Sequence, residues 1–173
     1  MTADFTSLAG HFLIAMPTMT DPAFAESVVY LLAHDQDGAL GLIINRTSGI
    51  TLATVMEQLQ SEFEPMDLDY DQDIFSGGPV QTELGFVLHG HGPKYKGTTV
   101  FPKLSLTASQ DALQAISKGQ GPLQSLIALG HAGWGAGQIE DELRANAWLA
   151  CPADLSIIFD TPVNERRSAA AAL

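Results

Sequence analysis

Residues 27–45 read SVVYLLAHDQDGALGLIIN, and this stretch decides the fold. Two apolar runs, Ser27–Ala33 and Leu40–Asn45, flank the segment His34–Gly38, whose Asp and Gly residues are typical of a tight turn. We therefore predict a β-hairpin here. Both runs are apolar at nearly every position, which is typical of strands that are covered on both faces.

Outward from the hairpin, further elements follow in a mixed order. Short apolar runs predict strands at 11–16, 73–76, 84–89, 98–101, 104–106, 124–129 and 155–159. Helical spacing and capping signals predict helices at 52–59 after Thr51, at 108–118 after Thr107, at 138–148, and from Pro162 onward. The order lacks a regular βαβ alternation. It favours an α+β fold with a mixed or antiparallel sheet over a doubly wound parallel one.

Composition bounds the class of protein. The chain has 173 residues, of which 46% are hydrophobic, so we expect one packed domain over residues 1–173. Eight Lys and Arg stand against 20 Asp and Glu, which gives a formal net charge of −12. Arg46 is the only Lys or Arg before Lys94, and 13 acidic residues lie in the same part of the chain.

This charge excludes several partners. Binding to nucleic acid or to an anionic membrane surface needs clustered Lys and Arg, so we expect neither. A lone cysteine, Cys151, suits a reducing compartment, and the N-terminal residues 1–9 lack the basic residues of a secretory signal. No apolar run approaches the ~20 residues that span a bilayer. We expect a cytoplasmic protein.

The strongest local motif is GHAGWGAGQIE at residues 130–140. Four glycines between a predicted strand and a predicted helix are compatible with a turn that binds a phosphate through backbone N–H groups. Asp160, 23 residues past Gly137, lies about where a dinucleotide fold places its ribose-binding acid. However, the spacing is G-x-G-x-G, and Glu140, Asp141 and Glu142 fill the first helical turn, where they would repel a phosphate. The other reading is a structural turn anchored by Trp134.

Other motifs are incomplete. Ser76 lies in a tight Ser-Gly-Gly-Pro turn but lacks the G-x-S-x-G pattern of a nucleophile. His89 and His91 lack a nearby third metal ligand, and the acidic segment 67–73 lacks the Gly and Glu of a calcium loop. Cys151 reads as a buried small residue. We therefore predict no metal and no cofactor.

Several segments occur together in one known order. They are LAGHFLIA at 8–15, GLIINR at 41–46, SGGPV at 76–80, the glycine-rich segment continuing as QIEDEL to 143, and NAWL at 146–149. On these motifs the chain resembles the bacterial YqgE/AlgH-like family over about residues 8–167. Two departures are His131, where Tyr is common, and Thr47, where Pro often follows. The resemblance implies a bifurcated, mostly antiparallel sheet folded into a pseudo-barrel with flanking helices, described as two intertwined lobes.

The resemblance implies little about function. Members are described as proteins of unknown function or as transcriptional regulators, and no catalytic residues carry over. Because the chain is acidic, any effect on transcription is expected through a partner. The leading hypothesis is a non-enzymatic binding or regulatory module with an unknown protein or small-molecule partner. The alternatives are a nucleotide- or anion-binding enzyme that uses the glycine-rich turn, and a direct DNA-binding regulator, which the charge disfavours.

We expect a binding surface where the motif turns meet, if the fold brings them together. Arg46 is the central candidate because it is an isolated cation, although isolated charges usually form structural ion pairs. No catalytic residue is predicted, and the sequence leaves the oligomeric state open. The candidate binding residues are Asn45, Arg46, Ser76, Gly77, Gly78, Gly133, Trp134, Gly135, Gln138 and Glu140.

Overall fold

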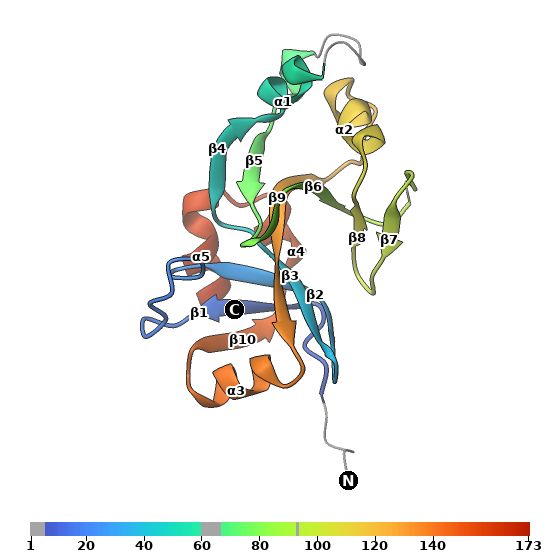
Figure 1. The fold of residues 1–173 in the computed structure, drawn as a ribbon. Helices are drawn as coiled ribbons and strands as arrows, with labels where there is room; N and C mark the ends of the chain where they lie inside the picture. Colours follow the sequence, from blue (N-terminus) through green and yellow to red (C-terminus); the bar gives the residue numbers. More distant parts are fainter. Residues whose placement is uncertain (1–5, 60–66, 93) are drawn as a thin grey trace.

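The computed structural model describes residues 6–59, 67–92 and 94–173 (Figure 1). Residues 1–5, 60–66 and Pro93 lie outside these ranges. The strands are β1 (His11–Ala15), β2 (Val28–Asp35), β3 (Gly38–Ile43), β4 (Thr47–Thr51), β5 (Asp73–Ser76), β6 (Val80–His89), β7 (Thr98–Val100), β8 (Ser105–Thr107), β9 (Ser125–Gly135) and β10 (Trp148–Pro152). The helices are α1 (Leu52–Gln58), α2 (Gln110–Ser117), α3 (Gln138–Arg144), α4 (Leu155–Phe159) and α5 (Arg166–Ala171), with 3₁₀ turns at Leu68–Tyr70 and Val163–Glu165.

The predicted hairpin is confirmed as β2 and β3. The two strands pair antiparallel up to Asp35 and Gly38, with a two-residue connection between them. The side chain of Asp35 accepts a hydrogen bond from the N–H of Asp37 at 2.8 Å, and Gly38 has a φ of +142°. This local turn chemistry sets the register of the hairpin.

The long strand β9 organises the sheet. It pairs antiparallel with β3 and β6 and parallel with β5, while β4 is attached through β5. The main strand order is β10-β1-β2-β3-β9-β6-β8-β7. In Figure 1, β9 runs from the half that carries α1 and α2 into the half that carries α3. The α+β class and the curled, mostly antiparallel sheet are therefore as predicted.

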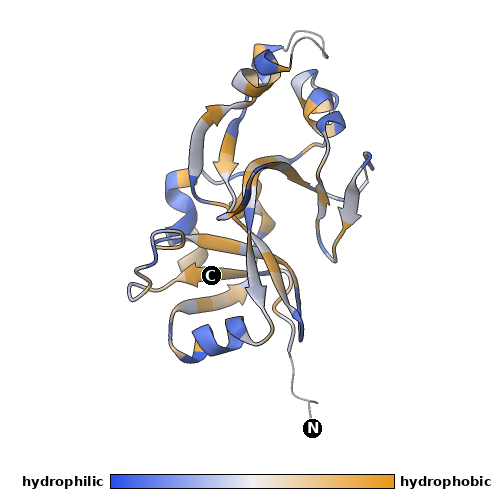
Figure 2. Cartoon of the chain, viewed as in Figure 1, coloured by the Kyte–Doolittle hydropathy of each residue, from blue (hydrophilic) through white to orange (hydrophobic). Residues whose placement is uncertain are grey.

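The core consists of three apolar clusters along this sheet. One contains Leu13, Val29 and both tryptophans, another lies under α1 and α2, and the largest lies between the sheet and helices α4 and α5. Figure 2 shows the apolar residues concentrated on the strands, whereas α3 is mostly polar. None of the helices in the described part of the chain is long and apolar enough to cross a membrane.

The glycine-rich turn predicted at 130–137 is wrong over most of its length, because β9 continues through it to Gly135. Gly133 pairs with Leu40 and Gly135 with Gly38. Ala132 and Trp134 are buried, while Gly133 between them and Gly135 after them are exposed. Buried and exposed residues therefore alternate as they do in a β-strand. Pairing with β3 extends β9 beyond residue 129, where the predicted strand ends.

Two further predictions near the C-terminus are wrong. The helix predicted to reach residue 148 ends at Arg144, because Asn146 adopts a left-handed φ of +60° and the chain then enters β10. Residues 155–159 form helix α4 rather than a strand. The side chain of Asp154 caps this helix by accepting from the N–H of Ser156, and β10 occupies the sheet edge beside β1 instead.

The helix-start predictions differ in detail. The N-cap of α2 is Ser109 and not Thr107, because Thr107 is the buried last residue of β8 and its hydroxyl contacts His89. Pro162 begins a 3₁₀ turn, and the regular helix α5 follows at Arg166.

Gly78 provides a test of the packing around β9. A Cβ at this position would lie 2.2 Å from the carbonyl carbon and oxygen of His131, and its φ is +153°. We expect Gly78→Ala to lower the free energy of unfolding by at least about 2 kcal/mol, because two backbones would have to separate. Urea denaturation measures the change.

Gly85 is the matched control. It lies in β6, the strand that follows the turn at Gly78. A Cβ there meets nothing within 4 Å. Gly85→Ala should change the free energy of unfolding by less than about 1 kcal/mol. Equal effects of the two substitutions would contradict the close approach at Gly78.

Candidate functional site

Asn45 and Arg46, shortly after β3, hold a surface loop through hydrogen bonds to its backbone. The side chain of Asn45 accepts from the N–H of Val28 at 2.8 Å and donates to the carbonyl of Glu26 at 3.0 Å. Arg46 donates to the carbonyl of Ala23 through Nη1 at 2.6 Å and to that of Ala25 through Nη2 at 2.9 Å. We call residues 16–26 the supported loop.

Among the described residues, Arg46 makes hydrogen bonds to backbone carbonyls and not the ion pair expected of an isolated charge. In the described part of the chain, no carboxylate lies within 4.0 Å of its guanidinium, so carbonyl oxygens take the place of the expected ion pair. Glu26, which these contacts help to hold, has a left-handed φ of +62°. The hydrogen bonds stabilise a backbone conformation that a glutamate rarely adopts.

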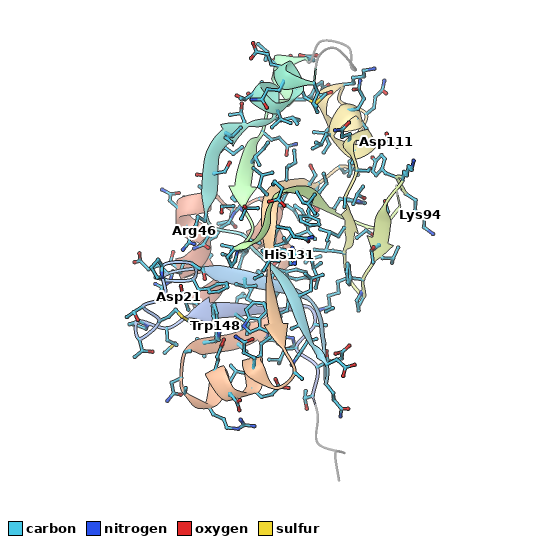
Figure 3. All side chains as sticks on the ribbon, viewed as in Figure 1. Asp21, Arg46, Lys94, Asp111, His131 and Trp148 are labelled. Carbon is cyan, nitrogen blue, oxygen red and sulfur yellow. The ribbon has the colours of Figure 1, made fainter. Side chains whose placement is uncertain are left out.

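The glycine-rich motif holds the same loop from its other side. The ring of Phe24 lies 5.9 Å from that of Trp134 and 5.7 Å from that of Trp148, and the two indoles are 6.2 Å apart. Both tryptophans are buried, although they come from different strands, β9 and β10. Figure 3 shows Asp21, Arg46 and Trp148 along one side of the molecule.

One carboxylate joins the two tryptophans. Oε1 of Glu142, on α3, accepts a hydrogen bond from Trp148 Nε1 at 2.8 Å and from Trp134 Nε1 at 3.1 Å. Its Oε2 accepts from the side chain of Gln138 at 2.9 Å, and Gln138 in turn accepts from the N–H of Gly135 at 3.0 Å. The most specific part of the motif is therefore a structural network, as the reading with Trp134 as an anchor predicts.

This geometry does not favour a phosphate site at residues 130–137. Gly135 already donates its N–H to Gln138, and α3 carries Glu140 and Asp141 in its first turn. Glu140 lies 3.4 Å from the imidazole of His34, whose Nδ1 accepts the N–H of Leu8. The N–H of Gly135 is thus committed to the fold, and the acidic residues of the first turn would repel a phosphate.

The structure brings some of the predicted binding residues together. Arg46, Ser76 and Gly78 line a small cavity of about 150 Å³ with Thr82 and Ala23. Gly77 lies beside them and donates its N–H to Leu129 in β9. The other candidates do not line this cavity: Gly133, Trp134 and Gly135 lie at the end of β9, and Gln138 and Glu140 lie on α3. Of these, Trp134 contacts Phe24 of the supported loop.

The remaining polar candidates have internal partners. The imidazole of His89 is buried and hydrogen-bonded to Thr107, and His91 is hydrogen-bonded to Ser105. Asp67 caps the 3₁₀ turn that follows it. Burial raises the pKa of the Cys151 thiol, which disfavours the reactive thiolate. Within the described residues, no group of three or more His, Cys, Asp or Glu side chains is placed to hold a metal ion.

Sequence reasoning missed a larger cavity of about 440 Å³ on the side of the sheet that faces α4 and α5. Asp160 lines it, but as the residue that ends α4 and not at the end of a strand. Arg166 also lines it and is buried, with 8% of its surface exposed. No motif marked Arg166, because the other residues that line the cavity come from residues 72–75, 122–126 and 158–163, all outside its own helix.

The curled, mostly antiparallel sheet with its flanking helices places the chain in the α+β class. The chain belongs to the AlgH-like family (DUF179), whose model matches residues 12–173. The UPF0301 protein AlgH of Pseudomonas aeruginosa is 56% identical over 96% of this chain and 88% of its own length. A UPF0301 protein of Pseudomonas fluorescens is 54% identical over 95% and 87%.

Solved structures agree with this assignment. The solution structure of AlgH from Pseudomonas aeruginosa has a TM-score of 0.84 at 56% identity, covering 96% of this chain and 88% of that one. A crystal structure of a Corynebacterium diphtheriae protein has a TM-score of 0.64 at 21% identity, covering 88% and 79%, and shows the shared fold.

The tryptophan network predicts a large effect at Glu142. Glu142→Ala leaves two buried indole N–H groups without their acceptor, so we expect a loss of about 2–4 kcal/mol in the free energy of unfolding. Denaturation followed by tryptophan fluorescence measures it.

Asp141, the preceding residue, serves as a control because its partner Arg144 is exposed. Asp141→Ala should cost less than about 1 kcal/mol. If Glu142→Ala were as mild as this control, the carboxylate would not be what joins the two indoles.

Proposed function

We propose that the chain is a non-enzymatic binding module that recognises another protein through the supported loop, residues 16–26. One observation carries the proposal: two independent sets of contacts converge on this loop. Arg46 and Asn45 bind its backbone, and Trp134 and Trp148 enclose the ring of Phe24. A loop that is held in one conformation loses little entropy when it binds, which favours recognition.

The surface of the loop suggests the chemistry of the partner. Pro17, Thr18, Thr20, Asp21 and Pro22 are exposed, and the loop contains acidic but no basic residues. The chain as a whole has a formal net charge of −12. A partner with a basic surface is therefore favoured, and any influence on transcription would pass through such a partner in the cytoplasm.

The test places two positive charges on the loop. Thr20→Arg combined with Pro22→Arg should abolish capture of the partner from a native lysate, because it neutralises the two acidic charges of the loop, Asp21 and Glu26, without removing a hydrogen bond that holds the loop. The captured protein, once identified by mass spectrometry, is purified and titrated calorimetrically. We expect its affinity to fall at least tenfold with the loop variant and to weaken with added salt.

A variant with the same change in charge elsewhere is the control. Thr99→Arg with Gln120→Arg alters two exposed residues remote in sequence from the loop and should leave the affinity unchanged. Equal loss with both variants would contradict recognition by the loop. Binding of the wild type to DNA at low salt in a mobility-shift assay would instead support the DNA-binding alternative.

A further inference from the structure

The cavity beside α4 and α5 has a buried cation at its wall. The guanidinium of Arg166 donates from Nε to the carbonyl of Thr161 at 2.9 Å and from Nη1 to that of Ile44 at 2.6 Å. Its carbon Cζ lies 4.8 Å above the centre of the Phe75 ring. These contacts fix the position and plane of the group, with Nη2 left without a hydrogen-bond partner among the described residues.

This cation has no carboxylate partner. Within the described ranges, no Asp or Glu oxygen lies within 4.0 Å of Arg166. Burial lowers the pKa of Arg166 by removing water from the charged group. A buried charge is costly unless an opposite charge compensates it, and carbonyl dipoles and a ring face do so only in part. An arginine fork that lines a cavity is a natural receptor for a carboxylate.

The opposite charge lies elsewhere in the same cavity. Asp160 and Asp73 line it and are exposed, and the amide of Gln124 donates to the carboxylate of Asp160 at 3.3 Å. The cavity volume of about 440 Å³ lies in the range of ~300–1,000 Å³ that is usual for small-ligand sites. A simple anion would be repelled by the two carboxylates. A ligand that carries both a negative and a positive group could pair with Arg166 and with one of the carboxylates at the same time.

We propose that this cavity binds a free α-amino acid or a closely similar zwitterionic acid. The ligand carboxylate would lie at Nη2 of Arg166, and its ammonium group would lie at the carboxylate of Asp160. This site is separate from the supported loop and does not depend on the function proposed for it.

Calorimetric titration of the full chain tests the site directly. The titrants are the individual L-amino acids, acetate and inorganic phosphate. We expect one or a few amino acids to bind and the two simple anions not to bind. The methyl ester of the binding amino acid removes its carboxylate, and the N-acetyl derivative removes its ammonium group. Each should bind at least about tenfold more weakly.

Variants assign the two ends of the ligand. Arg166→Lys and Asp160→Asn should each weaken the amino acid at least about tenfold, because each removes one directed charged contact. Asp160→Asn should not further weaken the N-acetyl derivative, which has no ammonium group to lose. Arg167→Lys and Glu165→Gln, neighbouring substitutions outside the cavity lining, are the matched controls and should have no effect.

Three results would overturn the proposal. They are the absence of binding by every amino acid at about 10 mM, equal binding of acetate or phosphate, and amino-acid affinity that the Asp160→Asn variant leaves unchanged. Arg166 also binds two carbonyls of the fold, so its variant is first checked for a native thermal transition. If Arg166→Lys does not fold, Asp160→Asn and the two ligand derivatives decide the question, since Asp160 is exposed.

Discussion

Two backbones cross at van der Waals distance where the turn after β5 meets the middle of β9, and the rest of the sheet depends on this crossing. A Cβ on Gly77 would lie 2.4 Å from the carbonyl oxygen of Gly130, and a Cβ on Gly130 would lie 2.4 Å from that of Gly78. The exclusion is thus reciprocal, and a side chain on any of these three glycines would separate the segments.

The crossing explains how one strand serves two parts of the fold. On one side of it, β9 pairs with β5 and β6, and on the other side it pairs with β3. The carbonyl of Gly77 accepts the N–H of Ile43 at the end of β3, so the hairpin is joined to the turn at the same point. Asn45 and Arg46, whose side chains hold the supported loop and the start of β2, follow β3 just beyond this point.

The sequence was sufficient to predict features that depend on local chemistry. The hairpin at 27–45 was predictable because both its strands and its turn are encoded within 19 residues. Helix α4 was not, because Leu155–Phe159 is a short apolar run that is compatible with either a strand or a buried helix. Its outcome is set by the cap at Asp154 and by the fact that β10 already pairs with the edge of β1.

In the candidate site, too, the features set by local sequence were predictable and those set by contacts between distant segments were not. The sequence singled out Arg46, Ser76 and Gly78 because each belongs to a turn at a strand end, and these three line one small cavity. It could not show that Trp134 and Trp148 share the carboxylate of Glu142, since this contact depends on where β10 returns beside α3. Nor could it show the cavity at Arg166, which is assembled from β5, β9, α4 and α5.

The arginines also change how the net charge of −12 is understood. Although the chain has 20 acidic residues, Arg46, Arg166 and Arg167 all donate to backbone carbonyls. Within the described ranges, Arg144 is the one arginine with a carboxylate partner, Asp141. These permanently charged side chains therefore stabilise loops and strand ends through hydrogen bonds to the backbone. They leave most of the acidic residues without a neutralising arginine. An acidic surface of this kind attracts basic partners and repels simple anions. In the cavity at Arg166, a guanidinium placed below the surface lies with the carboxylates of Asp73 and Asp160, and this combination favours a ligand that carries both signs of charge.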